Sequence, residues 1–294
     1  MAAKIIDGKQ IAAQIREELK TQVAELKTKG VVPGLGVILV GADPASISYV
    51  TAKEQACADI GMYSDDNRLP ANTSQKDLVA LVKKMNSDPK INGILVQLPL
   101  PKGLNEAEIL LTIDPDKDVD GFHPLNVGRM VVGEKAFLPC TPHGVVQLLL
   151  RSGVTLDGAK VVIVGRSNIV GKPLANMLIQ KSPTGNATVT VCHTRTKDIA
   201  GHCRQADIVI AAAGRPNTIT ADMIKPGAVV IDVGVNRVED KTKKSGFRLV
   251  GDVDFEAVKE KASLITPVPG GVGPMTITML LYNTVESAKR FAGC

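Results

Sequence analysis

The segment from Val161 to Gly171 constrains the fold of this chain more than any other part of the sequence. It opens with four β-branched apolar residues, passes through a Gly-Arg-Ser turn at 165–167 and ends at a second glycine, and an amphipathic stretch follows at 172–180. This order predicts a buried parallel strand, a tight turn and a helix N-terminus, which together can hold a dinucleotide pyrophosphate on free backbone N–H groups. The spacing departs from G-x-G-x-x-G. Taken alone, the segment also fits an ordinary strand-to-helix turn.

Composition narrows the class of protein. A chain of 294 residues is long enough for about two domains. With 44% hydrophobic and 22% charged residues it is globular, and it has no Trp, which argues against stacking platforms for single-stranded nucleic acid. The net charge of +5 is not gathered into a basic stripe. We therefore expect no nucleic-acid partner.

Cysteine usage and hydropathy indicate the compartment. The cysteines are odd in number, scattered and never in a C-x-x-C pair, which is typical of reduced thiols in a cytoplasmic protein. The sequence shows no signal peptide and no run of 18 apolar residues, so no membrane partner is expected. The acidic segment 116–121 lacks the EF-hand spacing, and no metal site is predicted. The cysteines are Cys57, Cys140, Cys192, Cys203 and Cys294.

Apolar runs alternate with amphipathic segments along the whole chain. Such alternation predicts an α/β fold of two αβα domains with mostly parallel sheets, the second of them Rossmann-type, with a cleft between them. The expected boundaries are 1–140 plus 274–294 for the first domain and 141–273 for the second. We expect the apolar stripe of the last helix, 275–292, to pack on the first domain. The expected strands are 34–40, 63–69, 91–98, 161–164, 187–192, 207–212 and 228–233; the expected helices include 11–29, 46–60, 75–85, 143–151 and 172–180, with a hinge at 139–142 and a polar surface loop at 239–246.

Ligands bind beyond the carboxyl ends of parallel strands, and three polar residues and a glycine-rich loop stand near such places. Tyr49 and Lys53 are four apart on a predicted helix and share one face, although a surface lysine beside a half-buried tyrosine has the same pattern. Gln97 ends an apolar run, either as a satisfied buried amide or as a group that orients a ligand. The loop 267–275 holds three glycines and three prolines before a helix, so its backbone can approach a ligand closely.

Five motifs in one order now identify a resemblance that spans essentially the whole chain. They resemble those of the bifunctional methylenetetrahydrofolate dehydrogenase/cyclohydrolase family. The resemblance implies oxidation of 5,10-methylenetetrahydrofolate with NADP, then hydrolysis to 10-formyltetrahydrofolate, within one-carbon metabolism and purine biosynthesis. It also implies a homodimer through the Rossmann-type domain. The motifs are Tyr49-x-x-x-Lys53, Val96-Gln-Leu-Pro-Leu-Pro101, Lys117-Asp-Val-Asp-Gly121, Gly165-Arg-Ser-x-Ile-Val-Gly171 and Pro267-Val-Pro-Gly-Gly-Val-Gly-Pro-Met-Thr276.

The resemblance assigns roles in the first domain, which becomes the folate-binding and catalytic one. Lys53 matches the family's essential lysine and would activate the attacking water, with Gln97 holding the amine and the substrate in register. Asp120 matches the pterin-binding carboxylate, and Tyr49 would stack on or hydrogen-bond to the folate. The other residues expected to bind substrate are Val96, Leu98, Pro269, Gly270, Gly271, Gly273 and Pro274.

The resemblance likewise assigns the cofactor site. Arg166 favours NADP over NAD, because a guanidinium can grip a 2′-phosphate in a bidentate fork. Some family members with the equivalent arginine use NAD with inorganic phosphate and Mg²⁺, so NAD stays an alternative. A different two-domain NADP dehydrogenase would explain this half but not Gln97 or Asp120, and a folate-binding protein without activity is a third reading. The expected cofactor-binding residues are Gly165, Arg166, Ser167, Thr194, Arg195 and Val235.

Overall fold

The apolar runs of the sequence form the central strands of two parallel sheets in the computed structural model, which describes residues 2–243 and 246–293. By its contacts the chain divides into one unit of Met1–Ala12 with Thr141–Thr276 and another of Ala13–Cys140 with Ile277–Cys294. All three changes of unit fall inside helices: α1 (Gly8–Thr28), α6 (Cys140–Arg151) and α10 (Val272–Phe291). Residues 1–12, which the sequence predicts in the first domain, are grouped with 141–276 because β1 (Lys4–Ile5) pairs with β11 (Leu264–Ile265).

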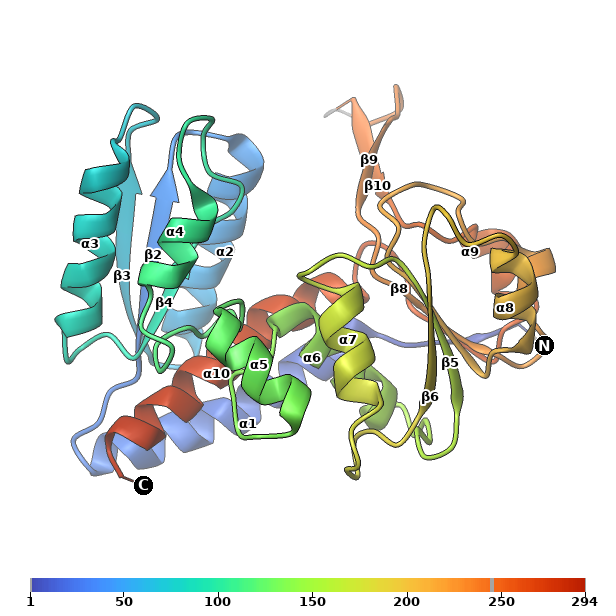
Figure 1. Ribbon diagram of the computed structural model, residues 1–294, viewed down its shortest axis with the longest axis horizontal. Helices are drawn as coiled ribbons and strands as arrows, with labels where there is room; N and C mark the ends of the chain where they lie inside the picture. Colours follow the sequence, from blue (N-terminus) through green and yellow to red (C-terminus); the bar gives the residue numbers. More distant parts are fainter. Residues whose placement is uncertain (1, 244–245, 294) are drawn as a thin grey trace. The chain divides into compact units, whose positions relative to one another are not determined.

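The unit that contains Lys53 is built on a three-stranded parallel sheet in the order β3-β2-β4 (Figure 1). All seven residues of the central strand β2 (Gly34–Val40) are buried, as expected for a run that is apolar on both faces. The ladder continues past β4 (Gly93–Val96), since the Gln97 N–H donates to Ile38 O at 2.9 Å. The remaining elements of this unit are β3 (Tyr63–Leu69), α2 (Pro44–Asp59), α3 (Gln75–Ser87), α4 (Glu106–Thr112) and α5 (Pro124–Val132).

The final helix completes this same unit. Residues 277–294 belong to it, and α10 lies beside α1 (Figure 1), where the Arg16 guanidinium donates to Thr278 Oγ1 at 3.0 Å. Ser287 Oγ donates to Asn92 O at 2.6 Å, which ties the helix to the segment before β4. The predicted packing of the last helix against the first domain is therefore confirmed.

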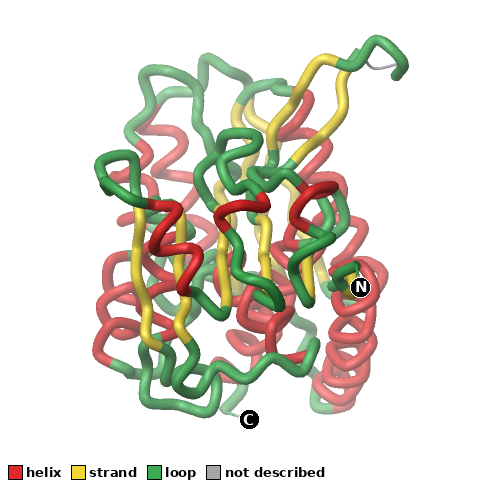
Figure 2. Tube along the Cα trace, turned by 90° about the vertical axis from the view of Figure 1, so that its right-hand side faces the viewer, coloured by secondary structure: helices red, strands yellow, loops and turns green. Residues whose placement is uncertain are grey.

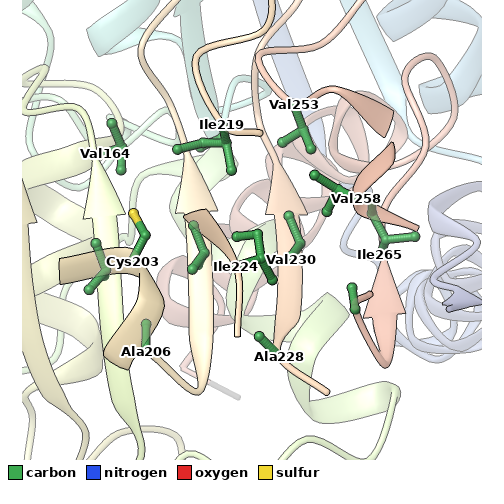
Figure 3. Packing of buried hydrophobic residues seen from close by; sticks show 14 of the residues in the cluster. Val164, Cys203, Ala206, Ile219, Ile224, Ala228, Val230, Val253, Val258 and Ile265 are labelled. Atoms are coloured by element: carbon green, nitrogen blue, oxygen red, sulfur yellow. The ribbon is translucent and has the colours of Figure 1, made fainter. Parts of the chain in front are cut away.

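The other unit contains a six-stranded parallel sheet in the order β1-β11-β8-β7-β5-β6. Strand order reverses at β5 (Lys160–Val164), which lies between β6 and β7, so its carboxyl end is the topological switch point where open parallel sheets bind ligands. One face of the sheet is covered by aliphatic side chains that include Val164, Val230 and Ile265 (Figure 3). The other elements are α6 (Cys140–Arg151), α7 (Gly171–Leu178), β6 (Thr188–Cys192), α8 (Ile199–Gln205), β7 (Ile208–Ala211), the 3₁₀ helix Ala221–Met223, β8 (Val229–Asp232) and α9 (Phe255–Val258).

Two segments differ in detail from expectation. Residues 140–142 of the predicted hinge form the first turn of α6, where Pro142 is tolerated because its missing N–H would have no partner within the helix. The predicted loop 239–246 joins an antiparallel hairpin of β9 (Asn236–Glu239) and β10 (Phe247–Val250), which extends away from the six-stranded sheet (Figures 1 and 2). Residues 244–245 and Cys294 lie outside the described residues, and the other four cysteines are free.

Hydropathy of the helices agrees with this layered fold. Among residues 2–243 and 246–293, no helix combines the length and apolarity that crossing a membrane requires.

Candidate active site

Lys53 and Gln97 meet at the carboxyl end of the three-stranded sheet. Lys53 lies on α2, whose start is fixed by the Asp43 carboxylate accepting from Ser46 N and by Pro44 in the first turn. Its side chain is only 8% exposed, and Nζ donates to Gln97 Oε1 at 3.0 Å. The Gln97 amide is held in turn because Nε2 donates to Leu98 O at 2.8 Å. The contact predicted from the sequence is therefore present.

Asp120 and Cys140 are the charged and titratable neighbours of Lys53. Burial lowers the pKa of Lys53, and the negative charge of Asp120 opposes that shift. Burial raises the pKa of Asp120, opposed by the charge of Lys53 and a hydrogen bond from the Cys140 thiol. Both shifts favour the neutral forms, so the amine is suited to accept a proton. Cys140 also lies 3.3 Å from Val119 O.

Asp118 fixes the backbone segment that carries Asp120. Its side chain is 1% exposed and accepts hydrogen bonds from Phe122 N, His123 N and Asn126 Nδ2 at 3.2, 2.8 and 2.9 Å. Burial raises the pKa of Asp118 to about 6 despite these donors. The sequence interpretation singled out neither Asp118 nor Cys140 as part of the site. Asp118 lies in the acidic segment 116–121, which could have drawn attention to it, whereas no local sequence pattern marks Cys140.

The remaining expected substrate residues fall into two groups. Tyr49 lies one turn before Lys53 on α2 and is 48% exposed, while Val96 is buried at the end of β4. Residues 269–274, predicted as a loop, belong to the other unit, and residues 272–274 form the start of α10 instead of a loop. Within that unit a Cβ on Gly8 would lie 1.8 Å from Gly271 O, so the loop backbone runs directly against the start of α1.

The turn after β5 forms a cradle of backbone donors. Gly165 has a φ of +139° and a Cβ there would lie 2.0 Å from Ala212 O, while a Cβ on Gly171 would lie 2.1 Å from Gly165 O. Ser167 Oγ accepts from Val170 N at 3.1 Å, which shapes the turn. Because these N–H groups lie before a helix at the switch point, they fit the pyrophosphate of a dinucleotide. Within this described turn, the N–H groups that have no partner are those of Arg166, Ser167, Asn168 and Ile169.

Two arginines stand at the ends of neighbouring strands of this sheet. Arg166 follows β5, Arg195 follows β6, and both side chains are exposed. Thr194 beside Arg195 is also exposed, and Val235, after β8, is 52% exposed. A 2′-phosphate on the adenosine ribose would find two guanidinium groups and no carboxylate in the residues directly after β6. The residues present therefore fit NADP.

Comparison with known proteins covers both units. Residues 6–120 match the catalytic domain of tetrahydrofolate dehydrogenase/cyclohydrolase and residues 139–292 match its NAD(P)-binding domain. A protein of Syntrophus aciditrophicus called bifunctional protein FolD is 61% identical over the full length of both chains.

Solved structures agree with these matches. The bifunctional methylenetetrahydrofolate dehydrogenase/cyclohydrolase FolD of Campylobacter jejuni is 51% identical and superposes with a TM-score of 0.92, covering 98% of this chain and 99% of its own. The Trypanosoma brucei dehydrogenase-cyclohydrolase, solved with NADP cofactor and an inhibitor, is 42% identical with a TM-score of 0.94 over 100% of both chains. The chain belongs to the tetrahydrofolate dehydrogenase/cyclohydrolase family.

Proposed function

We propose that this chain oxidises 5,10-methylenetetrahydrofolate with NADP and hydrolyses the methenyl product to 10-formyltetrahydrofolate. The observation that carries the proposal is the buried Lys53 amine, 3.0 Å from Gln97 Oε1 and under the charge of Asp120. Such a group meets the needs of a hydrolysis that must move a proton at neutral pH.

Lys53 acts in the hydrolytic step. Water adds to the methenyl carbon and loses one proton, the bond from that carbon to N5 breaks as N5 takes up the proton of the resulting hydroxyl, and the formyl group remains on N10. The neutral Lys53 amine takes the proton that the water loses or orients that water. Gln97 holds the amine in place, and Tyr49, partly exposed one turn away, packs on the folate.

Positioning dominates the dehydrogenase step. NADP, when bound, accepts the hydride that the methylene carbon releases as the folate nitrogen donates its lone pair. The side chains need only hold the two molecules and exclude water. Asp120 accepts from the donor edge of the pterin, with Val96, Leu98 and residues 269–274 as further folate contacts. The nucleotide is bound by Gly165, Arg166, Ser167, Thr194, Arg195 and Val235.

The domain boundaries, the compartment, the metabolic role and the oligomeric state complete the proposal. Residues 1–140 with 274–294 form the folate-binding domain and 141–273 the NADP-binding domain. The protein works in the cytoplasm, supplies one-carbon units for purine biosynthesis and is a homodimer through the NADP-binding domain. Arg166 and Arg195 favour NADP over NAD.

The Lys53→Gln variant tests the central assignment. Hydrolysis of methenyltetrahydrofolate should fall by about 10²- to 10⁴-fold, the usual contribution of a general acid or base, whereas NADP affinity should stay unchanged. Lys84→Gln, an exposed change on α3, is the matched control and should leave both quantities at wild-type level. Hydrolysis at near wild-type rate in the Lys53 variant would refute the role of this amine. Wild-type protein that does not reduce NADP with methylenetetrahydrofolate would refute the activity itself.

A further inference from the structure

The unit that contains Lys53 has a cavity at the end of its sheet opposite to Lys53. Its volume is about 550 Å³, within the range of about 300–1,000 Å³ typical of small-molecule sites. It lies where β2 to β4 begin, whereas Lys53 and Gln97 lie where parallel strands end. The segments that line it are 30–32, Tyr63, 89–92 and the last turn of α10. None of them belongs to the site described above.

The walls of this cavity are apolar and aromatic. Val32, Tyr63 and Phe291 line it and are 48%, 43% and 54% exposed, an unusual grouping of large apolar side chains at a surface. The Lys117 amine lies 5.7 Å from the centre of the Phe291 ring, a cation–π contact that favours one position of the ring. Two aromatic residues around one cavity favour a flat, unsaturated ligand over an aliphatic one.

The floor of the cavity offers a hydrogen-bond donor. Asn92 is only 6% exposed, and its Oδ1 already accepts from Gly34 N at 2.9 Å. Its backbone N–H and C=O are also bonded, to Gly34 O and to Ser287 Oγ. Among the described residues, the Asn92 Nδ2 group has no acceptor, and it is not one of the fully buried unpaired atoms, so it is open to the cavity. It can therefore donate to an oxygen of a bound ligand.

The rim of the cavity carries a positive charge. Lys90 lines the cavity with an exposed side chain, and within the described chain its amine forms no ion pair. We propose that this cavity binds a planar aromatic carboxylate, with its rings between Tyr63 and Phe291 and its carboxylate accepting from Asn92 and facing Lys90. A neutral aromatic amide of the same shape would gain the ring contacts but not the charge pairing.

Titration calorimetry with 2-naphthoate, and with neutral 2-naphthamide as the matched ligand, tests this proposal on the full chain. We expect saturable binding of naphthoate at one site. Asn92→Asp keeps the acceptor for Gly34 N but replaces the donor with a negative charge. This variant should weaken the binding of naphthoate at least about 10-fold. Lys90→Gln should weaken the binding of naphthoate by up to about 5-fold and leave the binding of 2-naphthamide unchanged. The controls Asn72→Asp and Lys84→Gln, both exposed and outside the cavity, should bind as wild type.

Two further measurements keep the outcome decisive. Saturating tetrahydrofolate and NADP should not displace naphthoate, because the cavity lies away from the folate site; displacement would overturn the proposal. Val32→Asp alters an exposed position, so it should fold and should abolish binding of the anion even where Asn92→Asp is unstable. Unsaturable binding, or equal binding by the wild type and all three cavity variants, would show only adventitious hydrophobic contact and would likewise overturn it.

Discussion

At the scale of single residues, the Lys53 amine is governed by the group at its hydrogen-bonding distance. That group is the uncharged Gln97 amide, so burial dominates and lowers the pKa of Lys53. Gln97→Glu would place an anionic oxygen where the amide oxygen now lies and raise the pKa of Lys53. If the neutral amine assists hydrolysis, the rising limb of the pH–rate profile should move up by about 1–3 pH units.

The pH–rate profile of cyclohydrolase activity measures this effect directly. Gln14→Glu, the same change at an exposed position of α1, should leave the profile in place. A Gln97 variant that loses rate equally at every pH would show that the amide acts on substrate geometry and not on the proton affinity of Lys53.

At the scale of elements, the close packing of β5 against α7 depends on Gly171. A Cβ at this position would lie 2.1 Å from Gly165 O and 2.9 Å from the Arg166 Cα, and neither backbone atom can move without opening the turn. Gly171→Ala should therefore weaken the binding of NADP at least about 10-fold, because it displaces the N–H donors of the turn. Fluorescence titration with NADPH measures the loss.

Gly128 provides the matched control for that change. It lies in α5, and a Cβ there would meet nothing within 4 Å. Because alanine favours the helix over glycine, Gly128→Ala should stabilise the protein by up to about 1 kcal/mol and leave NADP affinity unchanged. Equal NADP affinities for both variants would contradict the proposed role of the turn.

The sequence predicts those strands whose pattern lies within the strand itself, and misses those that form only by pairing with distant segments. β2 and β5 are continuous apolar runs, and the predicted strands 34–40 and 161–164 agree with Gly34–Val40 and Lys160–Val164. β1 and β11 have two residues each and no pattern, and exist only because they pair with each other and β8.

The same distinction applies to the candidate site. Helical spacing and the end of an apolar run marked Lys53 and Gln97 as candidates, and only the family resemblance assigned them roles. The hydrogen bond between Cys140 and Asp120 joins positions 20 residues apart, and only the folded chain places them together.

At the scale of the whole molecule, the proposed homodimer needs an interface on the NADP-binding unit. The β9–β10 hairpin has unpaired edges and extends from its sheet, and Leu249 on it is 44% exposed. We expect the wild type to sediment as a dimer and Leu249→Asp to shift it toward monomer, since a charge opposes burial of this position. Leu111→Asp, at a 58% exposed position of the other unit, should remain dimeric. If both variants sediment as the wild type does, the hairpin is not the interface.

Stability of the whole chain should depend on pH through the buried carboxyl of Asp232. This residue is 3% exposed, and burial raises its pKa from 3.8 to about 6, although the N–H groups of Gly234, Asp252 and Val253 donate to it. A folded pKa above the unfolded one means that the folded state keeps its proton longer. The contribution to stability is fully present below pH 3.8 and is lost as pH rises through about 6.

The shift corresponds to about 3 kcal/mol at about 1.4 kcal/mol per pKa unit. Asp232→Asn removes the titration, so its free energy of unfolding should fall less than that of the wild type between pH 4 and 7. The amide has one acceptor oxygen for three N–H donors and lowers stability at every pH. The informative quantity is therefore the slope of the unfolding free energy against pH, with each free energy measured by urea unfolding. Asp157→Asn, an exposed change in the same unit, should keep the wild-type slope. Parallel slopes for the wild type and the Asp232 variant would mean that this carboxyl stays ionised in the folded chain throughout the range, held by its three backbone donors against the cost of burial.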